Sequence, residues 1–309
     1  MNKTTFVFVA SFFVAVAFFA GFEGIAIGHQ TICAAIFIAL LGIPHGAIDH
    51  IIYLEGNGSN PFKFYSFYFG LMTVYAIAWI FFPMWSMLGF LALSAYHFGQ
   101  SQFTELAAIP ERKKIILYIS WGTSILAGLI YFNRIEIADL TVAIPDLAAV
   151  SVAFENVALY QTITISAAIL TCAILVDSFR KDQITSQRFA MELYTFAFIH
   201  FVFYALPLVV GFTLYFVFLH SSKVLIEEFA YLRKMRVDFS LKKFVRLLLP
   251  YTLVSLIGSG LLLAISMVGA INISAVLLSF ILISVLTLPH SVVMENFYSK
   301  LAMRNDEPV

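Results

Sequence analysis

Long apolar runs separated by short polar connections dominate the pattern of hydrophobic positions along this chain. Ten apolar segments can be drawn, each of about 20 residues, which is the length that an α-helix needs to cross a bilayer. They cover Thr5 to Phe22, His29 to Tyr53, Phe64 to Phe82, Trp85 to Leu106, Ile115 to Phe132, Leu159 to Phe179, Phe189 to Ala205, Leu208 to Phe229, Phe244 to Met267 and Ile271 to Tyr298. The seventh and eighth are divided at Pro207, because a run of about 40 apolar residues is too long for one span. The pattern predicts an all-α polytopic transmembrane helical bundle of about ten spans.

Basic residues alternate with these segments and indicate their orientation. They gather at Lys3, Lys63, Arg112 to Lys114, Arg180 to Arg188, Lys223 to Arg246 and Lys300 to Arg304. The connections between these groups carry almost no lysine or arginine: Gly21 to Gly28, Pro83-Met84, Leu206-Pro207 and Val268 to Ala270. Arg134 is the exception, and the acidic residues around it outnumber it. Since basic loops face the cytoplasm, both termini are expected to be cytoplasmic.

Two stretches are too polar to span a membrane. Asn133 to Asn156 is acidic and is expected to form an external loop that can hold an interfacial helix. Tyr231 to Lys243 is basic and is expected to be a cytoplasmic connection. No segment resembles a separate soluble domain, so residues 1–309 are interpreted as a single integral membrane domain.

Composition supports the membrane assignment and excludes some functions. The chain is 61% hydrophobic and 12% charged, about half the charged fraction of a typical soluble domain. A multi-pass protein of the cell (cytoplasmic) membrane is therefore expected. Acidic and basic residues balance at 18 each, so nothing points to a nucleic-acid partner. Cys33 and Cys172 both lie in apolar runs and are interpreted as small core residues rather than a disulfide or a metal pair.

Four histidines are predicted to lie at one depth in the membrane. His45, His97, His220 and His290 each precede the cytoplasmic end of an even-numbered span by eight or nine residues. At the rise of an α-helix, this places all four about 12 Å from the cytoplasmic edge. Imidazoles that four helices contribute at one level are typical of a metal site in a bundle core. The alternative for any single one is an interhelical hydrogen bond.

The remaining histidines rank lower as metal ligands. His50 lies closer to the end of its span and is turned away from His45, so it ranks below His290. His200 is interpreted as a packing residue, and His29 lies at the outer edge. Asp49 and Glu295 are expected either to orient the rings of His45 and His290 or to be solvated at helix ends.

The histidine ligands do not identify the metal, but their surroundings limit the kind of substrate that the site would take. Imidazole suits iron, copper, zinc and nickel. A site in apolar surroundings favours a lipid-soluble substrate, and four histidines on octahedral iron would leave two positions for dioxygen or substrate. Tyr96, Phe98 and Tyr215 lie near the histidines in sequence and would suit a polyene.

Four short patterns around these histidines resemble the Brp/Blh family of bacterial and archaeal β-carotene 15,15′-dioxygenases. They are Gly42-Ile-Pro-His45-Gly-Ala-Ile-Asp49, Ser94-Ala-Tyr-His97-Phe-Gly-Gln100, Phe218-Leu-His220-Ser221 and Leu288-Pro-His290. Their order and spacing fit along almost the whole chain. The resemblance implies an oxidoreductase that uses iron(II), Fe2+, and O2 to cleave the central double bond of β-carotene. It also implies two all-trans-retinal products and a functional link to a rhodopsin.

The resemblance carries iron-ligand roles onto His45, His97 and His220. In the family, the third pattern reads His-Ser-x-x-His and supplies a further ligand one turn later. Here that position is Val224. Either His290 completes the site, as the depth argument favours, or His50 does, or the activity differs.

Three alternatives remain at the level of sequence. A membrane transporter or carrier would also hold intramembrane histidine and aspartate, although no inverted repeat is evident. A two-iron desaturase or hydroxylase would need about eight clustered histidines, whereas this chain has 7 dispersed ones. A non-catalytic carotenoid-binding protein would bind pigment without consuming oxygen.

Overall fold

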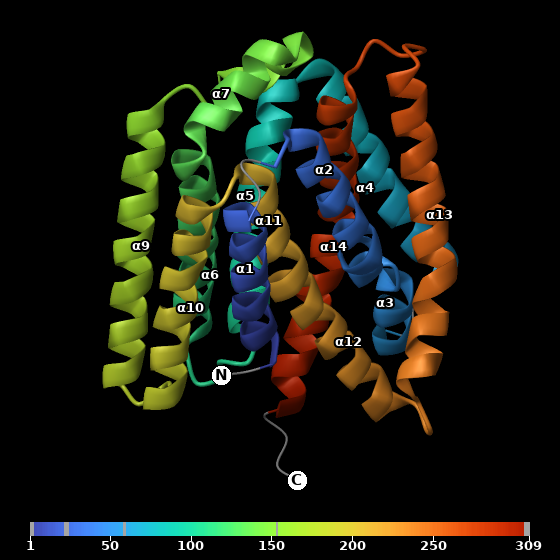
Figure 1. Ribbon diagram of the computed structural model, residues 1–309. Helices are drawn as coiled ribbons and strands as arrows, with labels where there is room; N and C mark the ends of the chain where they lie inside the picture. The colour runs from blue at the N-terminus through green and yellow to red at the C-terminus, as the bar shows by residue number, and fades with distance from the viewer. Residues whose placement is uncertain (1–2, 22–24, 58–59, 153, 306–309) are drawn as a thin grey trace.

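The protein is a bundle of helices, as the hydrophobic pattern predicts. The computed structural model describes residues 3–21, 25–57, 60–152 and 154–305 (Figure 1). All the regular secondary structure within these ranges is helical. Part of the expected Gly21 to Gly28 connection, residues 22–24, and the last four residues of the expected cytoplasmic C-terminus lie outside the described residues.

Eight of the helices that form the bundle are continuous. They are α1 (Lys3–Gly21), α4 (Pro61–Phe81), α5 (Pro83–Phe103), α6 (Glu111–Phe132), α9 (Val157–Arg180), α10 (Ser186–Ala205), α13 (Leu241–Met267) and α14 (Ala275–Asn305). α4 and α5 each begin with proline, which fits the first turn of a helix because no N–H is needed there. Each of these helices falls in a segment expected from the apolar pattern.

Two further segments are helical but interrupted, which the apolar pattern did not predict. The first consists of α2 (Ile27–Phe37), the π-helix η1 (Ile38–Gly42), the 3-10 helix η2 (Ile43–Gly46) and α3 (Asp49–Asn57). The second consists of α11 (Leu208–Thr213), the π-helix η4 (Leu214–Ser221) and α12 (Ser222–Met235). α12 ends at Met235 and so extends into the stretch from Tyr231 to Lys243 that is expected to be a cytoplasmic connection.

Seven helical stretches of the described chain are long and apolar enough to cross a membrane. They cover residues 27–55, 61–81, 111–132, 157–180, 208–235, 241–267 and 275–301. Their outward faces are apolar, as on α13, where Val254, Ile257 and Leu261 are 71%, 68% and 61% exposed. Apolar side chains exposed in this number are stable only against lipid, so the chain is a helical membrane protein.

A short helical layer lies across one end of the bundle. It consists of α7 (Arg134–Ala143), the 3-10 helix η3 (Pro145–Leu147) and α8 (Ala148–Ser151) (Figure 1). The Asn133 to Asn156 stretch therefore contains a helix, as expected. α1 begins and α14 ends at the opposite end of the bundle (Figure 1).

Two glycines hold α5 and α6 in direct backbone contact. A Cβ atom on Gly99 would lie 2.0 Å from the Tyr118 carbonyl oxygen, and one on Gly122 would lie 1.8 Å from the Ala95 carbonyl oxygen. Neither position can accept a side chain unless the helices separate. Because Gly99 is two residues from His97, this contact fixes the height and rotation of that histidine.

The expectation that both cysteines are core residues is wrong for Cys33. Cys33 is exposed on α2, while Cys172 is partly buried on α9 against the main apolar core. Both are free thiols, as expected. The apolar pattern cannot distinguish a lipid-facing position from a buried one, because both favour apolar residues.

Candidate metal centre

Four imidazoles from four separate elements meet inside the bundle. His45 lies on η2, His97 on α5, His220 on η4 and His290 on α14. The ring centroids are 5.5 Å apart for His45 and His220, and 5.0 Å apart for His220 and His97. They are 5.1 Å apart for His97 and His290, and 4.8 Å apart for His290 and His45. The four rings thus form a closed circuit, as the depth argument predicts.

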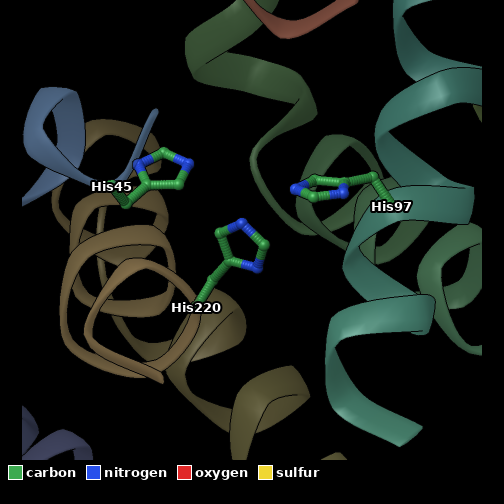
Figure 2. Close-up of side chains that lie close together, drawn as sticks. All are labelled: His45, His97 and His220. Atoms are coloured by element: carbon green, nitrogen blue, oxygen red, sulfur yellow. The ribbon is translucent and has the colours of Figure 1, made fainter. Parts of the chain in front are cut away.

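The ring nitrogens face a common space in the centre of this circuit. One nitrogen each of His45, His97 and His220 lies within 4.8 Å of the others, and all three are buried (Figure 2). His290 lies outside this closest group, although its ring borders those of His45 and His97. His97, His220 and His290 are 1%, 3% and 5% exposed, so the space lies deep in the protein.

Irregular helical turns position two of the four histidines. The π-helix η1 leads directly into η2, which holds His45, and the π-helix η4 holds His220 near its end. Pro44 lacks an N–H group, so the residue before His45 cannot donate the hydrogen bond of a regular helical turn. π-Helical turns shift the register of the side chains that follow them and are frequent at functional sites.

Hydrogen bonds fix the tautomers of His45 and His290. The Nδ1 atom of His45 contacts the Gly42 carbonyl oxygen, and Nδ1 of His290 lies 2.9 and 3.1 Å from the two Asp49 carboxylate oxygens. A carbonyl or a carboxylate can only accept, so Nδ1 carries the hydrogen in both rings. Each ring therefore presents the lone pair of Nε2, which is the form that binds a metal.

The same reasoning assigns the tautomer of His220. Its Nδ1 lies 3.0 Å from the Ser101 hydroxyl oxygen, and that hydroxyl donates its own hydrogen to the Phe98 carbonyl at 3.0 Å. The hydroxyl can then only accept from Nδ1–H. His220 Nε2 is left with a free lone pair.

Buried nitrogens without partners show that this donor set fits a metal ion. Within the described residues, Nε2 of His220, Nε2 of His290 and both ring nitrogens of His97 are buried and have no hydrogen-bond partner. A buried polar atom without a partner is costly, and four such atoms in one place require an explanation. A metal ion bound by the imidazoles supplies one, since histidine nitrogen is a common ligand of transition metals.

Asp49 supports a different histidine from the one expected. The expectation placed it four residues after His45 on one helix face, but the helix is interrupted at η2 and the carboxylate meets His290 instead. The Tyr68 hydroxyl donates to the same carboxylate at 2.9 Å. Tyr68, Asp49 and His290 thus form a chain of hydrogen bonds. In this chain a carboxylate holds a histidine ring, an arrangement that commonly orients metal ligands.

Glu295 does not orient His290 and lies in a different contact. It accepts hydrogen bonds from the Tyr96 hydroxyl at 2.8 Å and from the Gln100 side-chain amide at 2.6 Å. Because Tyr96 and Gln100 flank His97 on α5, Glu295 joins α5 to α14. Of the two alternatives expected for Glu295, an orienting contact with His290 is not found, whereas the side chain is exposed as a solvated position would be. Its contact links the elements that hold His97 and His290.

The other candidate histidines lie apart from the centre. The His50 ring packs 4.3 Å from Tyr251 and 6.0 Å from Tyr65. His200 is bonded to Ser124 at 3.0 Å and to the Phe196 carbonyl at 2.9 Å, as expected for a packing residue. His29 is exposed on α2.

Val224 is fully buried one turn after His220. It packs in an apolar cluster with Ile48, Leu232 and Met294. A histidine here would require that cluster to change, so this chain uses the position for packing.

Aromatic side chains enclose the centre on the side of η4. The Phe98 ring centroid lies 4.7 Å from that of His220, and the Phe216 centroid lies 5.6 Å from His45 and 5.8 Å from His220. Phe216, Ser101 and Tyr68 were not among the residues singled out in the sequence. Ser101 could have been found from the sequence, because it follows His97 by four residues. The contacts of Phe216 and Tyr68 could not, because they depend on the π-helix and on the packing of α4.

The fold and the centre together define an integral membrane protein with a buried cluster of imidazoles. Comparison with known proteins gives the family. A model of the family described as beta-carotene 15,15′-dioxygenase matches residues 36–298. The chain is also 24% identical over 285 residues to a beta-carotene 15,15′-dioxygenase of an uncultured marine bacterium, 66A03. That match covers 88% of this chain and 97% of the relative.

This chain belongs to the β-carotene 15,15′-dioxygenase family and is a carotenoid-cleaving dioxygenase. The family expected from the four histidine patterns is thereby confirmed. No solved structure matches the chain.

Proposed function

We propose that this protein cleaves β-carotene at its central 15,15′ double bond with O2, using one iron(II) ion held by His45, His97, His220 and His290. The carbon–carbon double bond breaks, each new end takes one oxygen atom of O2, and two molecules of all-trans-retinal result. The observation that carries the proposal is the circuit of four imidazoles, with centroid separations between 4.8 and 5.5 Å, in an apolar interior.

Iron(II) fits this set of ligands and the reaction class. Imidazole binds iron well, and no carboxylate or thiolate belongs to the closest donor group in the described chain. Iron supplies the reaction with dioxygen, which protein side chains cannot perform by themselves. His290 is proposed as the fourth ligand in place of a histidine at position 224. The support is its buried Nε2, which has no partner within the described residues, and its ring contacts with His45 and His97.

The protein positions the donors and excludes water. The Gly42 carbonyl, the Ser101 hydroxyl and the Asp49 carboxylate hold Nδ1–H of three rings, so the rings keep their orientation before metal arrives. Phe98 and Phe216 cover the rings from the side of η4. β-Carotene dissolves in lipid, so it would reach the centre sideways between helices, and the aromatic side chains would pack against the polyene.

We propose that the chain crosses the cell membrane ten times, with both termini cytoplasmic. The support is the agreement between ten helical segments and the alternation of basic loops. Seven of the segments meet strict criteria of length and hydropathy, and α1 is a shorter apolar helix over Lys3–Phe19. Retinal made here would pass into membrane lipid and could supply a rhodopsin.

The test of this function is expression in cells that make β-carotene, followed by chromatography of the extracted pigments. The wild-type chain should bleach the cells and yield retinal as the sole carotenoid-derived aldehyde. Single alanine substitutions of His45, His97, His220 and His290 should each abolish retinal formation. His200→Ala is the control, because His200 is a buried histidine already bonded to Ser124 and Phe196 outside the centre.

Retinal formation that persists in all four variants would overturn the site. Aldehydes of unequal length would retain the site but contradict central cleavage. Accumulation of intact β-carotene on the purified wild-type protein, without oxygen consumption, would show binding without catalysis.

A further inference from the structure

A surface pocket lies where α12 ends and α13 begins, at the same end of the bundle as the start of α1 and the end of α14 (Figure 1). Its volume is about 350 Å³, within the range of about 300–1,000 Å³ that small-molecule sites occupy. It is lined by Arg236, Val237, Phe239, Lys243, Arg246 and Leu247. The proposed reaction uses none of these residues, so the pocket is open to a separate role.

The wall of this pocket concentrates positive charge. Arg236, Lys243 and Arg246 line it, whereas no acidic side chain does so among the described residues. The Arg236 guanidinium is already paired with the Glu55 carboxylate, and it lies 5.5 Å from the centre of the Phe239 ring. The charge of Arg236 is therefore balanced within the protein, and the remaining charge of the pocket comes from Lys243 and Arg246.

These two remaining cations have no anionic partner. Neither Lys243 nor Arg246 forms an ion pair within the part of the chain that the structure describes. The Lys243 ammonium donates to the Asp238 backbone carbonyl at 2.9 Å, which is an uncharged acceptor. Asp238 is the only acidic residue between positions 233 and 246, and it does not line the pocket. Even if its carboxylate balances one cation, one positive charge remains for a bound anion.

The exposed apolar face of α13 places the pocket at the edge of the lipid. Leu241, Val245 and Leu249 follow one another at intervals of four residues and are 62%, 53% and 52% exposed. They extend the lipid-facing surface of α13 to its first turn, and Lys243 and Arg246 lie within the same turns. Basic side chains at the end of a membrane-spanning helix lie at the level of the lipid headgroups. The anions that such a pocket meets are lipid phosphates.

We propose that this pocket binds the phosphate group of an anionic phospholipid, with Lys243 and Arg246 as its cationic contacts. Arginine binds phosphate through two parallel N–H groups, and lysine adds a compact positive charge. Val237 and Leu247 give the pocket an apolar wall for the glycerol and the first acyl carbons. A phosphodiester whose headgroup has no ammonium, as in phosphatidylglycerol, carries the one negative charge that the pocket lacks. The proposal does not depend on the metal centre.

The test is titration of the purified, delipidated full-length chain with single lipids, with bound lipid counted by native mass spectrometry. Phosphatidylglycerol should bind more tightly than phosphatidylcholine, whose ammonium balances its phosphate. Lys243→Gln combined with Arg246→Gln removes both unpaired charges. Each basic residue near an anionic lipid contributes roughly a fivefold factor in affinity, so this variant should bind phosphatidylglycerol about 25-fold more weakly. Its affinity for phosphatidylcholine should change far less.

Arg233→Gln combined with Lys234→Gln is the matched control. Both residues are exposed at the end of α12, in the same basic connection, but neither lines the pocket. This variant loses the same net charge and should keep nearly all of its affinity for phosphatidylglycerol. Lys243→Arg combined with Arg246→Lys keeps both charges and should also bind it, which separates a loss of charge from a loss of structure.

Three results would overturn the proposal. Equal losses in the two glutamine variants would show a general attraction of the basic connection for anionic lipid, without a site. Equal affinity of the wild-type chain for the two lipids would show that charge is not recognised. Inorganic phosphate at constant ionic strength should not displace phosphatidylglycerol from the wild-type chain, and complete displacement would assign the pocket to free phosphate instead of lipid.

Discussion

At the scale of single residues, the centre depends on which ring nitrogen of each histidine carries a hydrogen. Gly42, Ser101 and Asp49 each accept from an Nδ1–H group, which leaves Nε2 of three rings free. His97 has no such partner among the described residues and is held by the close contact of α5 with α6 through Gly99. The donors are therefore oriented by their neighbours before any ion binds, which reduces the cost of ordering them.

Asp49 should contribute to metal binding through His290. Asp49→Asn exchanges a carboxylate, which can only accept a hydrogen bond from Nδ1–H, for an amide, which can also donate one. The tautomer of His290 is then no longer enforced. Partners of this kind typically change metal affinity by about 10- to 100-fold. We expect a rise of that size in the cobalt(II) dissociation constant. Tyr68→Phe removes only the supporting hydrogen bond and should give a smaller rise, and equal effects of both substitutions would contradict this assignment.

Ser101 offers a matched pair with Ser124, since each serine lies 3.0 Å from a histidine nitrogen. Ser101→Ala should weaken metal binding by about tenfold, because it frees the ring of His220. Ser124→Ala should not change metal binding, because His200 lies outside the centre. Metal content of the two proteins after identical purification checks this, and similar losses in both would refute the role of Ser101.

The residues that could be predicted from the sequence are those whose position depends on depth alone. His45, His97, His220 and His290 lie at corresponding places in four of the expected apolar segments, and the structure brings their rings together. Asp49 was assigned to the wrong histidine, because the i to i+4 rule holds only in a continuous α-helix and η2 interrupts this one.

At the scale of helices, the ten segments follow from hydrophobicity, while their interruptions do not. Each expected apolar segment is helical. The π-helices η1 and η4 are invisible to the pattern, because their residues are as apolar as those of the α-helices beside them. Their stability depends on contacts with other helices, such as Phe216 against Gly42, where a Cβ atom would lie 3.1 Å from the ring.

The contact between α5 and α6 should be intolerant of any side chain at Gly99. Gly99→Ala puts a methyl group where the Tyr118 carbonyl lies 2.0 Å away, so the helices must separate and His97 must move. We expect a loss of stability of about 1–3 kcal/mol or more, together with loss of metal. Thermal unfolding in detergent measures the first effect, and metal analysis measures the second.

Gly258→Ala is the control for this prediction. A Cβ atom at Gly258 on α13 meets no atom within 4 Å, and alanine favours a helix over glycine by about 1 kcal/mol. That variant should unfold at an equal or higher temperature. A Gly99→Ala protein as stable as wild type would show that α5 and α6 pack less closely than described.

At the scale of the whole molecule, the proposed orientation assigns each end of the bundle to one side of the membrane. Val142 on α7 is 85% exposed, and the Lys181 side chain at the end of α9 is 62% exposed at a basic connection. In a chain with Cys33 and Cys172 replaced by serine, Val142→Cys should react with an impermeant maleimide added to intact cells. Lys181→Cys should react only after the membrane is permeabilised, and the reverse pattern would contradict cytoplasmic termini.

The proposed function depends on metal bound by imidazole in the interior, and metal analysis of the active protein tests this most directly. The protein should be purified from cells that convert β-carotene, its iron counted per chain, and the iron examined by X-ray absorption. We predict one iron per chain surrounded by imidazole nitrogens, with both signals lost in His97→Ala. An active preparation that holds no metal, or whose iron has no imidazole ligand, would contradict it.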